Sequence, residues 1–89
     1  MKREEIEQFI ESYVEASEIL LADDFDDAFI GTAERFGMQA VAAYDEQKCI
    51  EILISQGMDE SEAREYFEYN TLGSWVGEGT PIFINLYRS

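Results

Sequence analysis

The sequence contains no histidine and one cysteine, and its basic residues are few. The lack of histidine removes the side chain that enzymes most often use as a general base and that proteins most often use as a transition-metal ligand. Because Cys49 is alone, no disulfide can form within the chain. No stretch is long and apolar enough to act as a secretion signal or a membrane span, so we expect a soluble, cytoplasmic protein.

Six basic residues stand against twenty acidic ones, which gives a formal net charge of −14. A field of this sign repels nucleic acids and anionic membranes, so we expect neither to bind directly. It attracts a protein with a basic surface and speeds the encounter with it. An alternative interpretation is that the charge serves solubility only. The length of 89 residues and the hydrophobic content of 46% predict one folded domain spanning 1–89.

The acidity is densest at the amino-terminal end, where residues 1–27 hold ten acidic and two basic residues. Apolar side chains recur at helical spacing from Ile6 to Val14, which predicts an amphipathic helix over 3–18. The opposite side of this helix carries a glutamate stripe consisting of Glu4, Glu7, Glu11, Glu15 and Glu18. An acidic turn follows, with Asp23, Asp24, Asp26 and Asp27 around a phenylalanine.

Residues 26–87 are expected to form the α+β core of the domain. Two strand-like segments meet at Gly37-Met38, which indicates a β-hairpin. Asp45 is suited to cap a second helix, and Asp59 with Glu62 has capping-box spacing at the start of a third. The predicted order is α-β-β-α-α-β, with helices at 3–18, 46–56 and 60–72 and strands at 29–36, 39–44 and 82–87. We expect a three-stranded, mostly antiparallel sheet with the helices packed on one face.

Candidate chemistry is sparse in this sequence. The four aspartates of the turn could supply oxygen ligands to a metal, but they lack the spacing of a calcium loop. Residues 77–81, Gly-Glu-Gly-Thr-Pro, lack the Gly-Lys-Ser/Thr ending of a phosphate loop and are better explained as a shaped connection. Cys49 lies on the apolar face of a predicted helix without a base to activate it. We therefore expect no enzyme activity, no catalytic residue, no metal and no cofactor.

Several short segments together resemble a family of small bacteriophage and bacterial proteins of uncharacterised function. The resemblance covers roughly 26–86. Its most specific parts are Tyr-Phe-Glu-Tyr-Asn at 66–70 and Gly-Glu-Gly-Thr-Pro at 77–81. The other segments are 26–31, 41–45, 48–50, 63–65, Gly73 and Val76. The resemblance implies a phage context, in which small acidic proteins are often inhibitors of host defence, including anti-CRISPR, anti-restriction and DNA-mimic proteins acting in the host cytoplasm.

Two hypotheses of function follow. In the first, the chain is an acidic inhibitor or interaction protein whose partner presents a basic surface, for example one that binds nucleic acid. Its expected contact residues are Glu4, Glu7, Glu11, Glu15, Glu18, Asp23, Asp24, Asp26, Asp27 and, as an aromatic anchor, Trp75. In the second, the chain is a structural or accessory domain in which Trp75, Tyr69, Tyr87 and an open strand edge form an oligomer or partner contact, for example in a homodimer.

Overall fold

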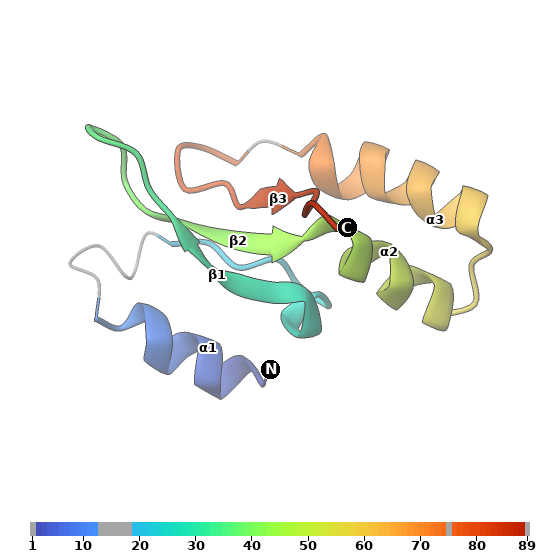
Figure 1. The fold of residues 1–89 in the computed structure, drawn as a ribbon, viewed down its shortest axis with the longest axis horizontal. Coiled ribbons are helices and arrows are strands. Elements are labelled where there is room, and N and C mark those ends of the chain that lie inside the picture. Colours follow the sequence, from blue (N-terminus) through green and yellow to red (C-terminus); the bar gives the residue numbers. More distant parts are fainter. Residues whose placement is uncertain (1, 13–18, 75, 89) are drawn as a thin grey trace.

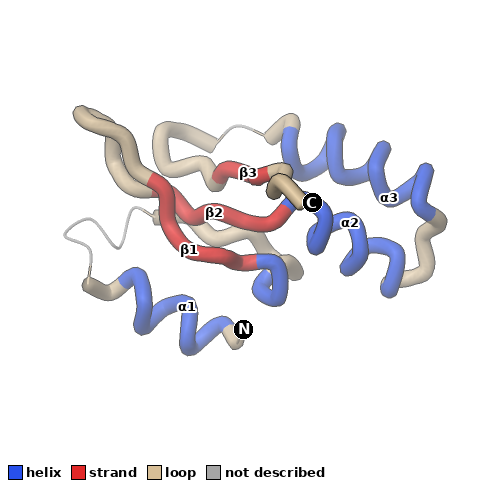
Figure 2. Tube along the Cα trace, viewed as in Figure 1, coloured by secondary structure: helices blue, strands red, loops and turns tan. Residues whose placement is uncertain are grey.

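The computed structural model describes residues 2–12, 19–74 and 76–88. Their elements follow the predicted order α-β-β-α-α-β, and the small α+β fold is thereby confirmed. The elements are α1 (Arg3–Ile10), η2 (Asp26–Ala28), β1 (Phe29–Ala33), β2 (Val41–Asp45), α2 (Glu46–Ser55), α3 (Glu60–Phe67), η3 (Glu68–Leu72) and β3 (Ile82–Ile84). Figures 1 and 2 show the three strands side by side, with α1 next to β1 and the α2–α3 pair beyond the end of the strands.

Strands β1 and β2 form the predicted antiparallel hairpin, with Phe29 opposite Tyr44 and Ala33 opposite Val41. The ladder is shorter than the sequence predicts, because residues 34–40 form a connection instead of strand. In this connection the Met38 N–H donates to the Arg35 carbonyl, and Gly37 has φ +82°. Residues 35–38 therefore have the features of a type II turn, in which the third residue has a positive φ. The twist of such a turn does not match that of paired strands, so the ladder does not continue up to it.

Strand β3 pairs in parallel with β2, so the sheet is mixed and its order is β1-β2-β3. The expectation of a mostly antiparallel sheet was wrong in this respect. The reason is the connection between the two strands. A parallel pair requires a crossover of a dozen or more residues, and α2, α3 and η3 provide one. Strand β3 also ends at Ile84, three residues before the predicted boundary.

The predicted capping residues of the two central helices are confirmed. The Asp45 carboxylate accepts hydrogen bonds from the backbone N–H groups of Gln47 and Lys48 at the start of α2. Asp59 and Glu62 form a reciprocal capping box at the start of α3, which continues into the π-helical turn η3. Two apolar residues at helical spacing from the buried ones, Ile54 on α2 and Tyr66 on α3, are nevertheless exposed. Each of these helices therefore buries fewer residues than its hydrophobic pattern predicts, because only one side of the helix contacts the core.

Helix α1 ends at Ile10, whereas the sequence predicts a helix to residue 18. Glu11 and Ser12 form a turn, and the Ser12 hydroxyl donates to the Phe9 carbonyl at 3.1 Å. Such a side-chain bond competes with the next helical backbone bond. Mutual repulsion within the glutamate stripe also opposes a longer helix. The rest of the predicted helix lies outside the described residues.

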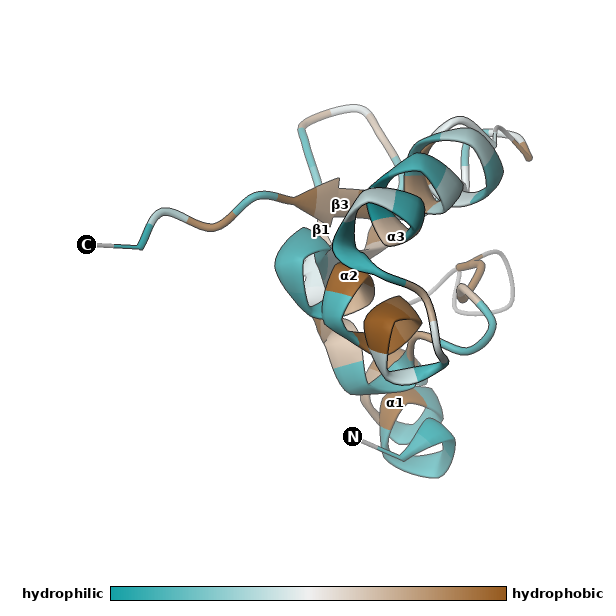
Figure 3. Cartoon of the chain, turned by 90° about the vertical axis from the view of Figure 1, so that its right-hand side faces the viewer, coloured by the Kyte–Doolittle hydropathy of each residue, from teal (hydrophilic) through white to brown (hydrophobic). Residues whose placement is uncertain are grey.

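Helices α1 and α3 both contact the face of the sheet that carries Phe29, Tyr44 and Phe83, and an aromatic row joins them across this face. Neighbouring rings lie 5.1 to 6.2 Å apart, a separation at which aromatic pairs attract one another. The row consists of Phe9, Phe29, Tyr44, Phe83 and Phe67, and it therefore links α1, all three strands and α3. In Figure 3 the carboxy-terminal residues beyond β3 run away from the helices. None of the described helices covers the opposite face of the sheet.

Candidate partner-binding surface

Three of the five predicted stripe residues are exposed: Glu4 and Glu7 on α1, and Glu11 in the turn that follows it. Ile6 and Ile10 are buried in the core, and this anchoring turns the glutamate side of the helix to solvent. Glu5 has a separate role, because its carboxylate accepts the Lys2 N–H at 2.9 Å and caps the helix. Glu15 and Glu18 lie outside the described residues.

Segment 23–27 forms the second part of the predicted contact set. Asp23 and Asp24 form an exposed turn, and Asp24 has φ +71°, a left-handed conformation that aspartate adopts more readily than most residues. Asp27 is also exposed. Asp26 is half-buried and is held by Arg3, whose Nε lies 3.1 Å from both carboxylate oxygens and whose Nη2 lies 2.9 Å from Oδ1. This bond is the main cause of a raised pKa of Arg3.

The Arg3–Asp26 pair joins the first turn of α1 to this acidic turn, twenty-three residues later in the sequence. Arg3 Nη2 also lies 3.8 Å from the almost fully exposed Asp23. One guanidinium thus holds together two acidic segments that would otherwise repel each other. We name the surface formed by Glu4, Glu7, Glu11, Asp23, Asp24 and Asp27 the acidic face. Asp26 lies at its base as a positioning residue, and Trp75 lies outside the described residues.

A second cluster of acidic residues lies on and next to α3, and it was not identified from the sequence as a candidate surface. Residues 59–68 contain five acidic residues and one basic residue. Glu60, Glu62, Glu65 and Glu68 are all exposed. Arg64 approaches Glu60 at 3.8 Å, one helical turn away, and both side chains are largely exposed. The density of acidic residues in 59–68 is the signal that would have revealed this cluster, but the larger number of acidic residues in 1–27 drew attention away from it.

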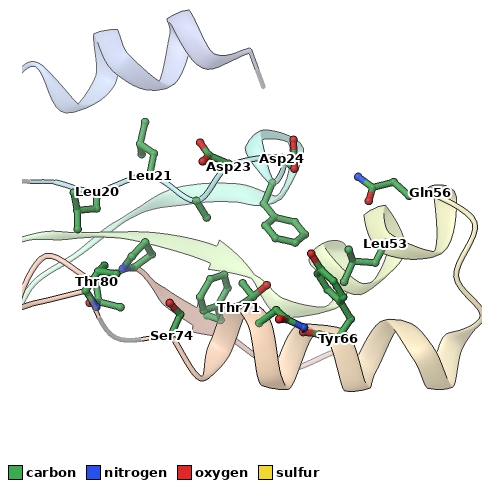
Figure 4. A pocket seen from close by; sticks show the side chains of 16 residues that line it. Leu20, Leu21, Asp23, Asp24, Leu53, Gln56, Tyr66, Thr71, Ser74 and Thr80 are labelled. Carbon is green, nitrogen blue, oxygen red and sulfur yellow. The ribbon is translucent and has the colours of Figure 1, made fainter.

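Between the acidic turn and α3 lies a groove of about 420 Å³. Figure 4 shows Asp23 and Asp24 on one wall and Tyr66, Thr71 and Ser74 on the other. Apolar side chains, including those of Leu21, Phe25, Leu53, Pro81 and Phe83, also line it. Among the described residues that line the groove, the two charged side chains are Asp23 and Asp24, both carboxylates. We name this feature the core-side groove.

The opposite face of the sheet carries a shallower depression of about 380 Å³. Ala33, Met38, Val41 and Ile82 give it an apolar lining, and Glu34, Arg35 and Glu78 contribute charged groups. Phe36, at the tip of the β1–β2 connection, is fully exposed. We name this feature the open-face depression. Tyr69 and Tyr87, which the second hypothesis places in a contact, are strongly exposed as well.

Asp45 and Arg88 form a pair that was not predicted from the sequence. Asp45 is buried, and its Oδ2 accepts a hydrogen bond from Arg88 Nη2 at 2.8 Å. Its Oδ1 accepts the two amide hydrogens at the start of α2. A buried carboxylate is costly unless it is paired and hydrogen-bonded, and this one is both. The pair is structural: it ties the carboxy-terminal segment to the β2–α2 junction.

The Cys49 thiol and the Tyr44 hydroxyl lie in buried environments that keep both groups protonated. Burial, with smaller contributions from the charges of Asp45 and Glu46, raises the pKa of the Cys49 thiol to about 12. Burial also raises the pKa of Tyr44, whose hydroxyl oxygen accepts the Ala22 N–H at 2.9 Å. Both groups are therefore neutral near pH 7. They serve packing and hydrogen bonding in the core.

The glycine-rich loop has the conformation of a connection, as the sequence predicts. Gly77 has φ +109°, and its carbonyl accepts both the N–H and the hydroxyl of Thr80. The same hydroxyl oxygen accepts the Val76 N–H at 2.9 Å. Thr80 therefore folds the loop on itself and directs the chain into β3 through Pro81.

Within residues 2–12, 19–74 and 76–88, no three acidic or cysteine side chains lie close enough together to hold a metal ion. None of the helices described has the length and hydropathy needed to cross a bilayer. Comparison with protein-family models, with curated proteins and with solved structures finds no match to this chain.

Proposed function

We propose that this chain is a non-enzymatic interaction protein that binds the basic surface of a partner protein through its acidic face. The observation that carries the proposal is the Arg3–Asp26 pair, which holds the glutamates of α1 and the aspartates of the turn together. A net charge of −14 reinforces this local concentration at long range. Approach of a basic partner is therefore favoured electrostatically before any contact forms.

A surface that ordinarily binds nucleic acid is the partner that best fits this acidic face. Along an α-helix, glutamates three and four residues apart are separated by about 4.5 and 6 Å of axial rise. Successive phosphates of one DNA strand are separated by about 3.4 Å of duplex axis. Glu4, Glu7 and Glu11 thus present a row of negative charges whose axial spacing is about one and a half times that of a phosphate strand. The resemblance to phage proteins supports a biological context for this partner: the chain would inhibit a host defence protein that binds nucleic acid.

An experiment on the unmodified protein tests this function. The immobilised chain is exposed to bacterial lysate at low and at high salt, and the captured proteins are then challenged with duplex DNA. We expect nucleic-acid-binding proteins at low salt, weaker capture at high salt, and release by DNA because the two ligands compete for one surface. Capture that is insensitive to both salt and DNA would rule the function out.

A second candidate function rests on the open-face depression. Its apolar lining and the exposed Phe36 are features of surfaces that bind another protein. In that case the chain is an accessory domain that associates through this side of the sheet, and its acidity serves solubility. Self-association that persists at high salt, measured by sedimentation equilibrium and lost in a Phe36→Ser variant, would favour this candidate over the first.

A further inference from the structure

The core-side groove combines an apolar interior with a carboxylate rim. Its volume of about 420 Å³ falls within the range of roughly 300–1,000 Å³ that is usual for ligand pockets. Asp23 and Asp24 stand on one wall, and no lysine or arginine is found among the described residues that line it. Leu20 and Val76, both partly exposed, extend the apolar lining to the rim.

We propose that the core-side groove binds a short amphipathic segment of the partner that carries both apolar and basic side chains. This inference rests on the proposed function and specifies the part of the partner that is recognised. Apolar side chains enter the groove against Phe25, Leu53 and Phe83, where their burial favours binding. Lysine or arginine side chains flanking them lie over Asp23 and Asp24, which form the edge that the groove shares with the acidic face.

Charge decides between this occupant and a second copy of the chain. Two copies would each carry a net charge of −14, and the rim of the groove is negative as well. Repulsion therefore opposes insertion of a segment from another copy, whereas a basic segment is attracted. A basic peptide without apolar side chains would leave the interior of the groove unfilled, so both properties are needed in one segment.

The test uses two synthetic helical peptides and fluorescence anisotropy. The first has leucines along one face and lysines along the other, and the second has alanine in place of every leucine. Both carry the same charge, so a difference between them reports apolar insertion. We expect the leucine peptide to bind wild-type protein at least about tenfold more tightly, since about 1.4 kcal/mol is less than the transfer free energy of one buried leucine.

A Leu20→Glu variant separates insertion from simple charge attraction. The added carboxylate strengthens binding of the leucine peptide if charge alone matters, whereas it weakens binding about tenfold if leucine enters the groove. Leu86→Glu is the matched control, because Leu86 lies outside the groove and is 39% exposed, against 38% for Leu20. Val76→Glu, on the opposite wall, repeats the test at a more exposed site if the first variant folds poorly by circular dichroism.

Each outcome has a defined meaning. Unchanged or tighter binding by Leu20→Glu and Val76→Glu overturns the groove assignment. If both peptides bind equally and salt weakens both, the acidic face is retained and the groove is rejected. If the leucine peptide shows groove-dependent binding while the lysate experiment finds no basic partner, the groove stands and the proposed function fails. Self-association of the wild type that Leu20→Glu abolishes would make the occupant a second copy and overturn the proposal.

Discussion

Loss of the Arg3–Asp26 pair should measurably destabilise the protein, because this pair fixes α1 against the acidic turn. The guanidinium makes three contacts of 2.9 to 3.1 Å with the carboxylate. The exposed fractions of the two side chains are 36% and 27%. A hydrogen bond to a charged group contributes about 1.5–3 kcal/mol when well shielded, whereas exposed ion pairs contribute about 0.2–1 kcal/mol. For this partly shielded pair we expect a coupling free energy of about 1–2 kcal/mol.

A double-mutant cycle with Arg3→Ala and Asp26→Ala isolates this coupling free energy from other effects of each substitution. The free energy of unfolding is measured for all four proteins by urea denaturation. The chain supplies its own control in Arg64 and Glu60, an exposed pair at 3.8 Å within one helix. A cycle on that pair should give no more than about 0.5 kcal/mol. Equal coupling energies for the two pairs would refute the role assigned to Arg3.

Three further predictions concern the core. Tyr44→Phe removes the hydroxyl that accepts the Ala22 N–H, and we expect urea denaturation to show a loss of about 1 kcal/mol in unfolding free energy; an unchanged value would contradict that role. The buried Cys49 thiol should resist thiol reagents in the native state and react in urea. Burial raises the pKa of this thiol from its ordinary value of 9.0 to about 12, so between these two pH values the unfolded thiol ionises while the folded one stays protonated. Wild type should therefore lose stability with rising pH more steeply than Cys49→Ala over this range, and parallel stability curves would contradict it.

Local features of this fold were predictable from the sequence because their causes lie within a few residues. Asp45 caps α2 through the amides two and three residues later, and the capping box joins Asp59 to Glu62, three positions apart. The hairpin follows from two adjacent strand-like segments with a glycine between them. The end of α1 at Ile10 was missed, because the hydrophobic spacing continues beyond the point where the helical backbone bonds stop.

Features that depend on distant residues were not predictable in the same way. The parallel pairing of β3 depends on where α2, α3 and η3 return the chain, and periodicity does not encode that path. Arg3 meets Asp26 across 23 positions, and Arg88 meets Asp45 across 43. The sequence identified the acidic residues of the candidate surface. Their assembly by Arg3 and the adjoining groove emerged only from the tertiary structure.

The most direct measurement is the affinity of the partner recovered from lysate for two charge-reversed variants. One carries Glu4→Lys, Glu7→Lys and Glu11→Lys on the acidic face. The other carries Glu34→Lys, Glu51→Lys and Glu78→Lys, three exposed positions elsewhere, and so has the same net charge. We expect the first variant to bind at least about tenfold more weakly than the second, a difference of about 1.4 kcal/mol. Equal affinities, or a larger loss in the second variant, would contradict a partner contact at the acidic face.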